Sequence, residues 1–77
     1  MKVRIKYSAH LNINGLDNGS SIDVAPGTTV FDFLSSYKVR DDHKKFITVA
    51  VNGEKKSLSY ALKNNDFLYL LLPVGGG

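Results

Sequence analysis

The sequence predicts one small α+β domain over residues 1–74, followed by a flexible tail over residues 75–77. In the domain we expect a mixed sheet of four to five strands, with one main helix packed on one face. Segments with alternating apolar and polar residues flank one segment with helical periodicity. Glycine, asparagine and proline separate these segments. A chain of 77 residues also suffices for only one compact core.

The first segments are predicted to form a hairpin. Val3, Ile5 and Tyr7 alternate with lysine and arginine, which is the pattern of a half-buried strand. A cluster of asparagine, aspartate and glycine follows and indicates turns. Ile22 and Val24 then alternate with polar residues, so we expect a second strand that pairs with the first.

The main helix is predicted to start after Thr29. This residue is the expected N-cap, because Asp32 stands three residues later in the capping-box position and suits the helix dipole. Residues 38–45 are predicted to form a charged loop. Four apolar side chains with helical spacing form the stripe expected to face the sheet: Val30, Phe33, Leu34 and Tyr37.

Two strands joined by a hairpin turn are predicted next. Residues 47–51 alternate, Asn52-Gly53 is a strong hairpin signal, and residues 54–57 suit a short, charged edge strand. Residues 58–62 are predicted to form a short helical turn. Residues 67–72 are almost continuously apolar, so we expect a central last strand that runs parallel to the first.

The last strand is followed by Pro73, Val74 and the glycines Gly75, Gly76 and Gly77. Proline ends a strand ladder because it has no N–H donor. Glycines can lie extended in a narrow channel, and without Cβ atoms they leave a terminal carbonyl open to attack. The tail therefore indicates a presented carboxylate, and a frayed end is the alternative.

Composition and charge disfavour several classes of protein. The sequence has no cysteine, which excludes disulfides and thiolate chemistry and favours a reducing cytoplasm. The longest apolar run is far shorter than the ~20 residues of a membrane helix, so we expect no membrane partner. The net charge is +3, but the cations are neither clustered nor interleaved with aromatic residues. We therefore do not expect nucleic acid as a partner.

No catalytic or metal site is predicted. His10 and His43 are the only histidines, and neither has a partnered nucleophile in the sequence pattern. The internal glycines fall in separate turns, so no phosphate-binding loop is present. We therefore do not expect an enzyme.

Four segments, in their order, resemble the prokaryotic ubiquitin-like sulfur carriers, the family of the molybdopterin synthase small subunit and the thiamine-biosynthesis sulfur carrier. They are residues 24–34, 49–54, 65–66 and 72–77. The terminal glycines after the last strand are the specific part of the resemblance. The resemblance implies a β-grasp, ubiquitin-like fold. This chain departs from the family in its net positive charge, and in having Asn65 where many members have glycine.

The resemblance also implies a mechanism centred on Gly77. An adenylating enzyme, similar to ubiquitin-activating enzymes, would activate the Gly77 carboxylate with ATP and Mg²⁺, which belong to that partner. A sulfur donor would then form a thiocarboxylate, and an acceptor synthase would use it in molybdopterin or thiamine biosynthesis or in tRNA thiolation. Gly76 is the required neighbour, and Pro73 to Gly75 set the exit direction. The Pro73-Val74 pair favours the molybdopterin branch.

A partner surface is predicted on the last strand. Tyr69 and Leu71 alternate with the leucines expected under the helix, so together with Ala50 they would form an exposed apolar patch. Cover by loops is the alternative. Two other functions stay open: a protein modifier joined to lysines through Gly77, and a non-covalent β-grasp binding module.

Overall fold

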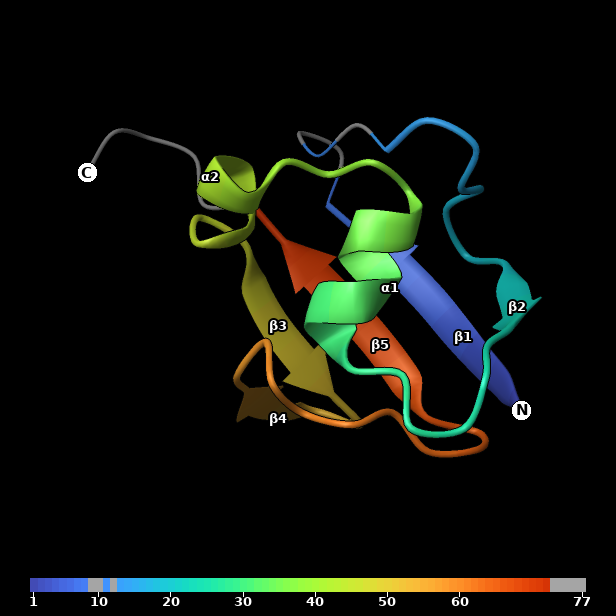
Figure 1. Cartoon of the computed structure of the whole chain (residues 1–77). Helices are drawn as coiled ribbons and strands as arrows, with labels where there is room; N and C mark the ends of the chain where they lie inside the picture. The colour runs from blue at the N-terminus through green and yellow to red at the C-terminus, as the bar shows by residue number, and fades with distance from the viewer. Residues whose placement is uncertain (9–10, 12, 73–77) are drawn as a thin grey trace.

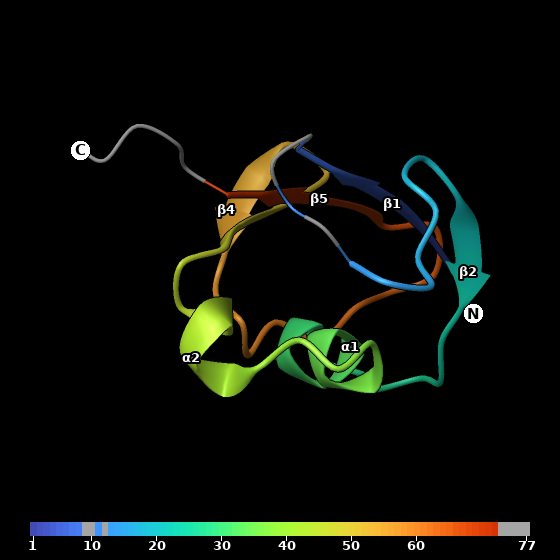
Figure 2. The same ribbon diagram turned by 90° about the horizontal axis from the view of Figure 1, so that it is seen from above.

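The computed structural model describes residues 1–8, 11 and 13–72. They form one mixed sheet, with two helices on one of its faces (Figures 1 and 2). Within these ranges no helix is both long and apolar enough to cross a membrane. The elements are β1 (Lys2–Tyr7), β2 (Ser21–Asp23), α1 (Val30–Ser36), α2 (Asp41–Lys44), β3 (Thr48–Val51), β4 (Glu54–Lys56) and β5 (Phe67–Leu71).

The sheet has the strand order β2-β1-β5-β3-β4, which confirms the predicted α+β fold with a central last strand. β5 runs parallel to β1 and antiparallel to β3. Leu68 lies opposite Ile5 on β1, and Leu70 lies opposite Val49 on β3. Since side chains alternate along a strand, this register places all four on the same face.

The core lies between the sheet and α1. Side chains from three strands meet the apolar stripe of the helix, and each keeps at most 2% of its surface exposed. Burying one such side chain stabilises the fold by roughly 1.5–3 kcal/mol. The side chains are Val3, Ile5, Val49, Val51, Leu68 and Leu70 from the sheet and Val30, Phe33 and Leu34 from the helix.

α1 begins as predicted. Thr29 Oγ1 accepts a hydrogen bond from the Asp32 N–H at 3.1 Å, and Asp32 Oδ2 accepts one from the Thr29 N–H at 3.5 Å. The predicted stripe includes Tyr37, whose ring lies 5.1 Å from that of Phe33 between centroids. Phe31, which falls off the stripe, keeps 38% of its surface exposed.

A second helix replaces the loop predicted over residues 38–45. α2 has its two aspartates in the first turn and its histidine and lysine in the last, which suits the helix dipole. Lys44 is only 1% exposed, and its Nζ donates to Ser35 Oγ at 2.6 Å and to Asp41 Oδ1 at 2.5 Å. The bond to Ser35 ties α2 to α1, and the bond to Asp41 lies within α2. A helix of four residues is too short to show apolar periodicity, so the loop prediction was wrong.

The helical turn predicted over residues 58–62 is also wrong. The segment forms a turn and then runs beside the start of α1. The Tyr60 carbonyl accepts a hydrogen bond from the Val30 N–H at 3.0 Å, and the Leu58 carbonyl accepts one from the Phe31 N–H at 2.9 Å. The first N–H groups of a helix have no partner within it. The segment therefore caps α1 instead of coiling.

Positive backbone φ angles confirm two predicted turns. Asn52 and Gly53 have φ angles of 53° and 84° and connect β3 to β4. Two such residues between paired strands are typical of a type I′ hairpin. Asn65, with a φ of 69°, replaces glycine in the turn before β5 because asparagine tolerates this region.

Asp66 fixes the start of β5. Its buried carboxylate accepts hydrogen bonds from Asn52 Nδ2 at 2.9 Å, the Tyr60 hydroxyl at 3.1 Å and the Lys63 N–H at 2.8 Å. Asn52 Oδ1 in turn accepts one from the Phe67 N–H at 2.9 Å. Burial opposes the charge, but the hydrogen bonds outweigh it and hold the pKa of Asp66 below its usual value. Burial and the bond to Asp66 raise the pKa of Tyr60.

Candidate functional site

The predicted chemical site lies outside the described residues. It comprises the carboxylate of Gly77, its neighbours Gly76 and Gly75, and the exit residues Val74 and Pro73. The roles assigned to them stay predictions. The structure instead describes the end of β5, from which this tail departs, and the two surfaces beside it.

The base of the tail is tied to the end of β1. The Ser8 N–H donates to the Leu70 carbonyl at 3.0 Å, and the Leu72 N–H donates to Ser8 Oγ at 3.1 Å. These two bonds extend the contact between the parallel strands one residue beyond β5. The last described residue before the tail is therefore fixed to the sheet.

The sheet face opposite the helices holds the predicted partner surface. Ala50 and Tyr69 are direct partners in the β3–β5 register, and Leu71 follows on the same face. With Phe67 they line a hollow of about 430 Å³, which also reaches the β3–β4 turn. We call these four residues the open-face patch. Leu71 and Phe67 keep 36% and 38% of their surfaces exposed, so loops do not cover them.

Phe67 and the charges beside the patch were not predicted as part of the surface. Phe67 has the same period-two spacing as Tyr69 and Leu71, and this signal places it on their face. The Arg4 guanidinium carbon lies 5.8 Å from the Phe67 ring centroid. Lys6 is the register partner of Tyr69. The open-face patch is thus apolar, with cations along its β1 side.

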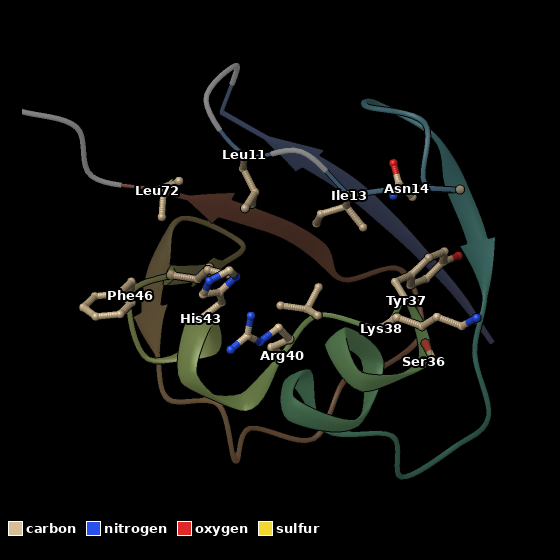
Figure 3. Close-up of a pocket in the computed structure, with 13 residues that line it drawn as sticks. Leu11, Ile13, Asn14, Ser36, Tyr37, Lys38, Arg40, His43, Phe46 and Leu72 are labelled. Carbon is tan, nitrogen blue, oxygen red and sulfur yellow. The ribbon is translucent and has the colours of Figure 1, made fainter.

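A second hollow, of about 840 Å³, lies on the helical side of the sheet at the same end of β5 (Figure 3). We call it the groove. It runs between the loop after β1 and the segment from the end of α1 to β3, and its wall includes Leu72. Sequence reasoning placed Leu72 under the helix but did not predict the groove. Its other main lining residues are Leu11, Ile13, Lys38, Val39, Arg40, His43 and Phe46.

Of the two histidines, the structure describes His43. His43 lies exposed on the groove wall, and His10 is outside the described ranges. Within those ranges, no three histidine, cysteine, aspartate or glutamate side chains gather as metal ligands.

The ThiS family model matches residues 6–77. Among solved structures, small archaeal modifier protein 1 (SAMP1) of Haloferax volcanii is 29% identical, with 95% of this chain and 98% of that chain covered and a TM-score of 0.72. The putative molybdopterin converting factor subunit 1 of Pyrococcus furiosus is 27% identical over the same shares of the two chains, with a TM-score of 0.70.

A third structure shows the likeness in fold alone. The ubiquitin of Caldiarchaeum subterraneum is 19% identical, with 100% of this chain and 98% of that chain covered and a TM-score of 0.58. The predicted β-grasp, ubiquitin-like fold is thereby confirmed. No curated protein matches the chain by sequence.

Proposed function

The chain belongs to the ThiS family, and from this membership we propose that it is a ubiquitin-like sulfur carrier whose Gly77 carboxylate is adenylated and then converted to a thiocarboxylate. The observation that carries the proposal is that the family match extends through the glycines to residue 77. The likeness to a putative molybdopterin converting factor subunit supports the same role. The sulfur would serve molybdopterin or thiamine biosynthesis or tRNA thiolation.

The proposed chemistry has two steps. A Gly77 carboxylate oxygen attacks the α-phosphorus of ATP, pyrophosphate leaves, and a mixed anhydride with AMP forms. A hydrosulfide equivalent from the sulfur donor then attacks the carbonyl carbon, and AMP leaves with the electrons of the broken C–O bond. ATP and Mg²⁺ are bound by the adenylating enzyme. This chain contributes a carbonyl without a neighbouring Cβ.

The described residues support a division of labour between domain and tail. From Val74 to Gly77 an extended chain spans on the order of 13–14 Å, enough to enter a partner's pocket. The open-face patch would meanwhile hold the domain against that partner, because its Phe67 and Leu71 side chains are exposed. Both the adenylating enzyme and the acceptor synthase would dock there in turn.

Intact mass spectrometry tests the proposal. The full chain is incubated with a ThiS-type adenylating enzyme, ATP, Mg²⁺ and a sulfur source, and a gain of ~16 Da is expected from the exchange of oxygen for sulfur. A reaction without ATP is the control. A chain that lacks Gly77 should give no product, and an unchanged yield from it would exclude the assignment.

The likeness to small archaeal modifier protein 1 favours a second candidate function, conjugation of Gly77 to lysines of other proteins. It uses the same acyl adenylate, with a lysine amine in place of sulfide as the nucleophile. Digests of cells that express the chain, made with a protease that cleaves after valine, would then contain lysines that carry the Gly75-Gly76-Gly77 remnant. Cells that express the chain without Gly77 provide the comparison.

A further inference from the structure

The groove has an apolar floor and a cationic rim. Figure 3 shows Leu11, Ile13 and Leu72 on one side, with Arg40 and His43 facing them from the other. Ile13 is only 4% exposed, whereas Arg40 and His43 are exposed. An apolar centre inside a polar, accessible rim is the usual anatomy of a protein–protein interface.

Backbone strain marks this rim. Lys38 has a φ of 62°, in the left-handed region. Its N–H donates to the Ser35 carbonyl at 2.9 Å, and the Val39 N–H donates to the Leu34 carbonyl at 3.1 Å, which are the two bonds of a Schellman helix end. Glycine usually occupies this position, and a side chain there costs about 1 kcal/mol. The fold therefore holds a cation where glycine would be more stable.

An exposed aromatic ring lies beside the cations. Phe46 keeps 61% of its surface exposed, the most of the large apolar side chains described. The Lys45 Nζ lies 5.7 Å from its ring centroid. Arg40 pairs with Asp42 at 2.8 Å, but both side chains are exposed, so the pair is weak and a partner's carboxylate can replace Asp42.

The lining favours a peptide segment over a small molecule. Small-molecule pockets enclose their ligand and fix it with a few buried polar groups. The buried side chains described in this groove, Ile13 and Ile47, are apolar. Apart from the half-buried Tyr37, the described polar lining residues are exposed: Asn14, Ser36, Lys38, Arg40 and His43.

We propose that the groove binds an extended acidic segment of a protein partner, with one large apolar side chain seated beside Phe46 and Leu72. Carboxylates of the segment pair with Lys38 and Arg40 and accept a hydrogen bond from His43. The net charge of +3 favours encounter with such a segment. Because Leu72 lies at the base of the tail, the partner is a protein that acts on the tail. That last assignment rests on the proposed function.

A peptide titration followed by ¹H–¹⁵N NMR tests the groove directly. The full chain is titrated with a capped peptide in which Phe-Leu is flanked on each side by three acidic residues. Peptides with lysines in place of the acids, or with serines in place of Phe-Leu, are the ligand controls. Saturable amide shifts confined to the groove, given by the acidic apolar peptide only, are expected.

Three variants make the test quantitative. Lys38→Glu with Arg40→Glu should weaken the acidic peptide roughly tenfold, because rim attraction becomes repulsion. Lys2→Glu with Lys63→Glu makes the same change in net charge at the opposite ends of β1 and β5, and should leave affinity unchanged. Phe46→Ser tests the apolar anchor with the charges kept. The dispersion of the same spectra shows that each variant is folded.

The proposal is overturned by an absence of saturable shifts, by equal binding of the lysine peptide, or by shifts centred on the open-face patch. Failure of the proposed function would show separately, as an unchanged intact mass of the chain after incubation with the adenylating enzyme. The titration needs neither ATP nor tail chemistry, so the two failures are distinguishable.

Discussion

The open-face patch and the groove both reach the end of β5 but are built differently. Leu71 contributes to the patch and Leu72 to the groove, so consecutive residues serve opposite surfaces. The patch lies on paired strands whose register fixes every side chain. The groove joins a loop, two helix ends and a strained Lys38. On paired strands, the register alone determines which side chains form the surface. Between loops, the backbone itself must hold the side chains in place, and here the strained Lys38 lowers the stability of the fold.

The largest expected effect separates the two faces of β5. Leu70→Ala should lower the free energy of unfolding by about 2–5 kcal/mol, because Leu70 is fully buried and its truncation leaves a cavity. Leu71→Ala, at a residue 36% exposed, should cost no more than about 1 kcal/mol. Urea denaturation measures both. Equal losses would mean that the patch is part of the core.

The next largest expected effect concerns Asp66, which fixes the start of the strand that carries the open-face patch. Asp66→Asn should cost about 1–3 kcal/mol at pH 7, because a charged acceptor of several hydrogen bonds is lost. The folded-state pKa of Asp66 is lowered, so its ionised form stabilises the fold above pH ~4. That contribution is lost as the pH falls through the folded pKa.

Denaturation curves recorded between neutral and acidic pH check the direction of this pH dependence. The wild-type chain should lose stability on acidification, and Asp66→Asn should show a smaller loss. An equal pH dependence in both would show that other carboxylates cause it.

The smallest expected effect is a gain in stability at the rim of the groove. Lys38→Gly should raise the free energy of unfolding by about 0.5–1 kcal/mol, because glycine relieves the left-handed strain. Asn65→Gly is the matched control, since asparagine already tolerates its φ of 69° and should gain less. Thermal denaturation compares the two. If Lys38→Gly instead lowers stability, the rim is not strained.

Much of the fold was predictable because local signals agree with the tertiary structure. Strand alternation, the Thr29–Asp32 capping box and the Asn52-Gly53 turn each reappear with the expected partners. α2 was missed because four residues carry no period, and its stability depends on the buried Lys44. Residues 58–62 were mispredicted because the hydrogen-bond needs of α1, far away in sequence, determine their path.

The candidate site was predictable in part for the same reason. Alternation along β5 placed Tyr69 and Leu71 on one face, and the pairing of Ala50 with Tyr69 brought the third residue beside them. The groove was not predictable, because its walls come from segments that only the folded chain brings together. The one sequence signal of the strain at Lys38 is the absence of glycine after the helix.

Asn52 also determines how long a purified sample stays chemically homogeneous. An asparagine followed by glycine is prone to deamidation, because the unhindered glycine N can attack the side-chain amide to give a succinimide. Here that amide donates to Asp66 and accepts from the Phe67 N–H, and both bonds must open first. The product, an aspartate or isoaspartate, would face the Asp66 carboxylate at close range. Asn52 belongs to the β3–β4 turn and also lines the hollow of the open-face patch. In aged material the hairpin and the patch should therefore be disrupted together.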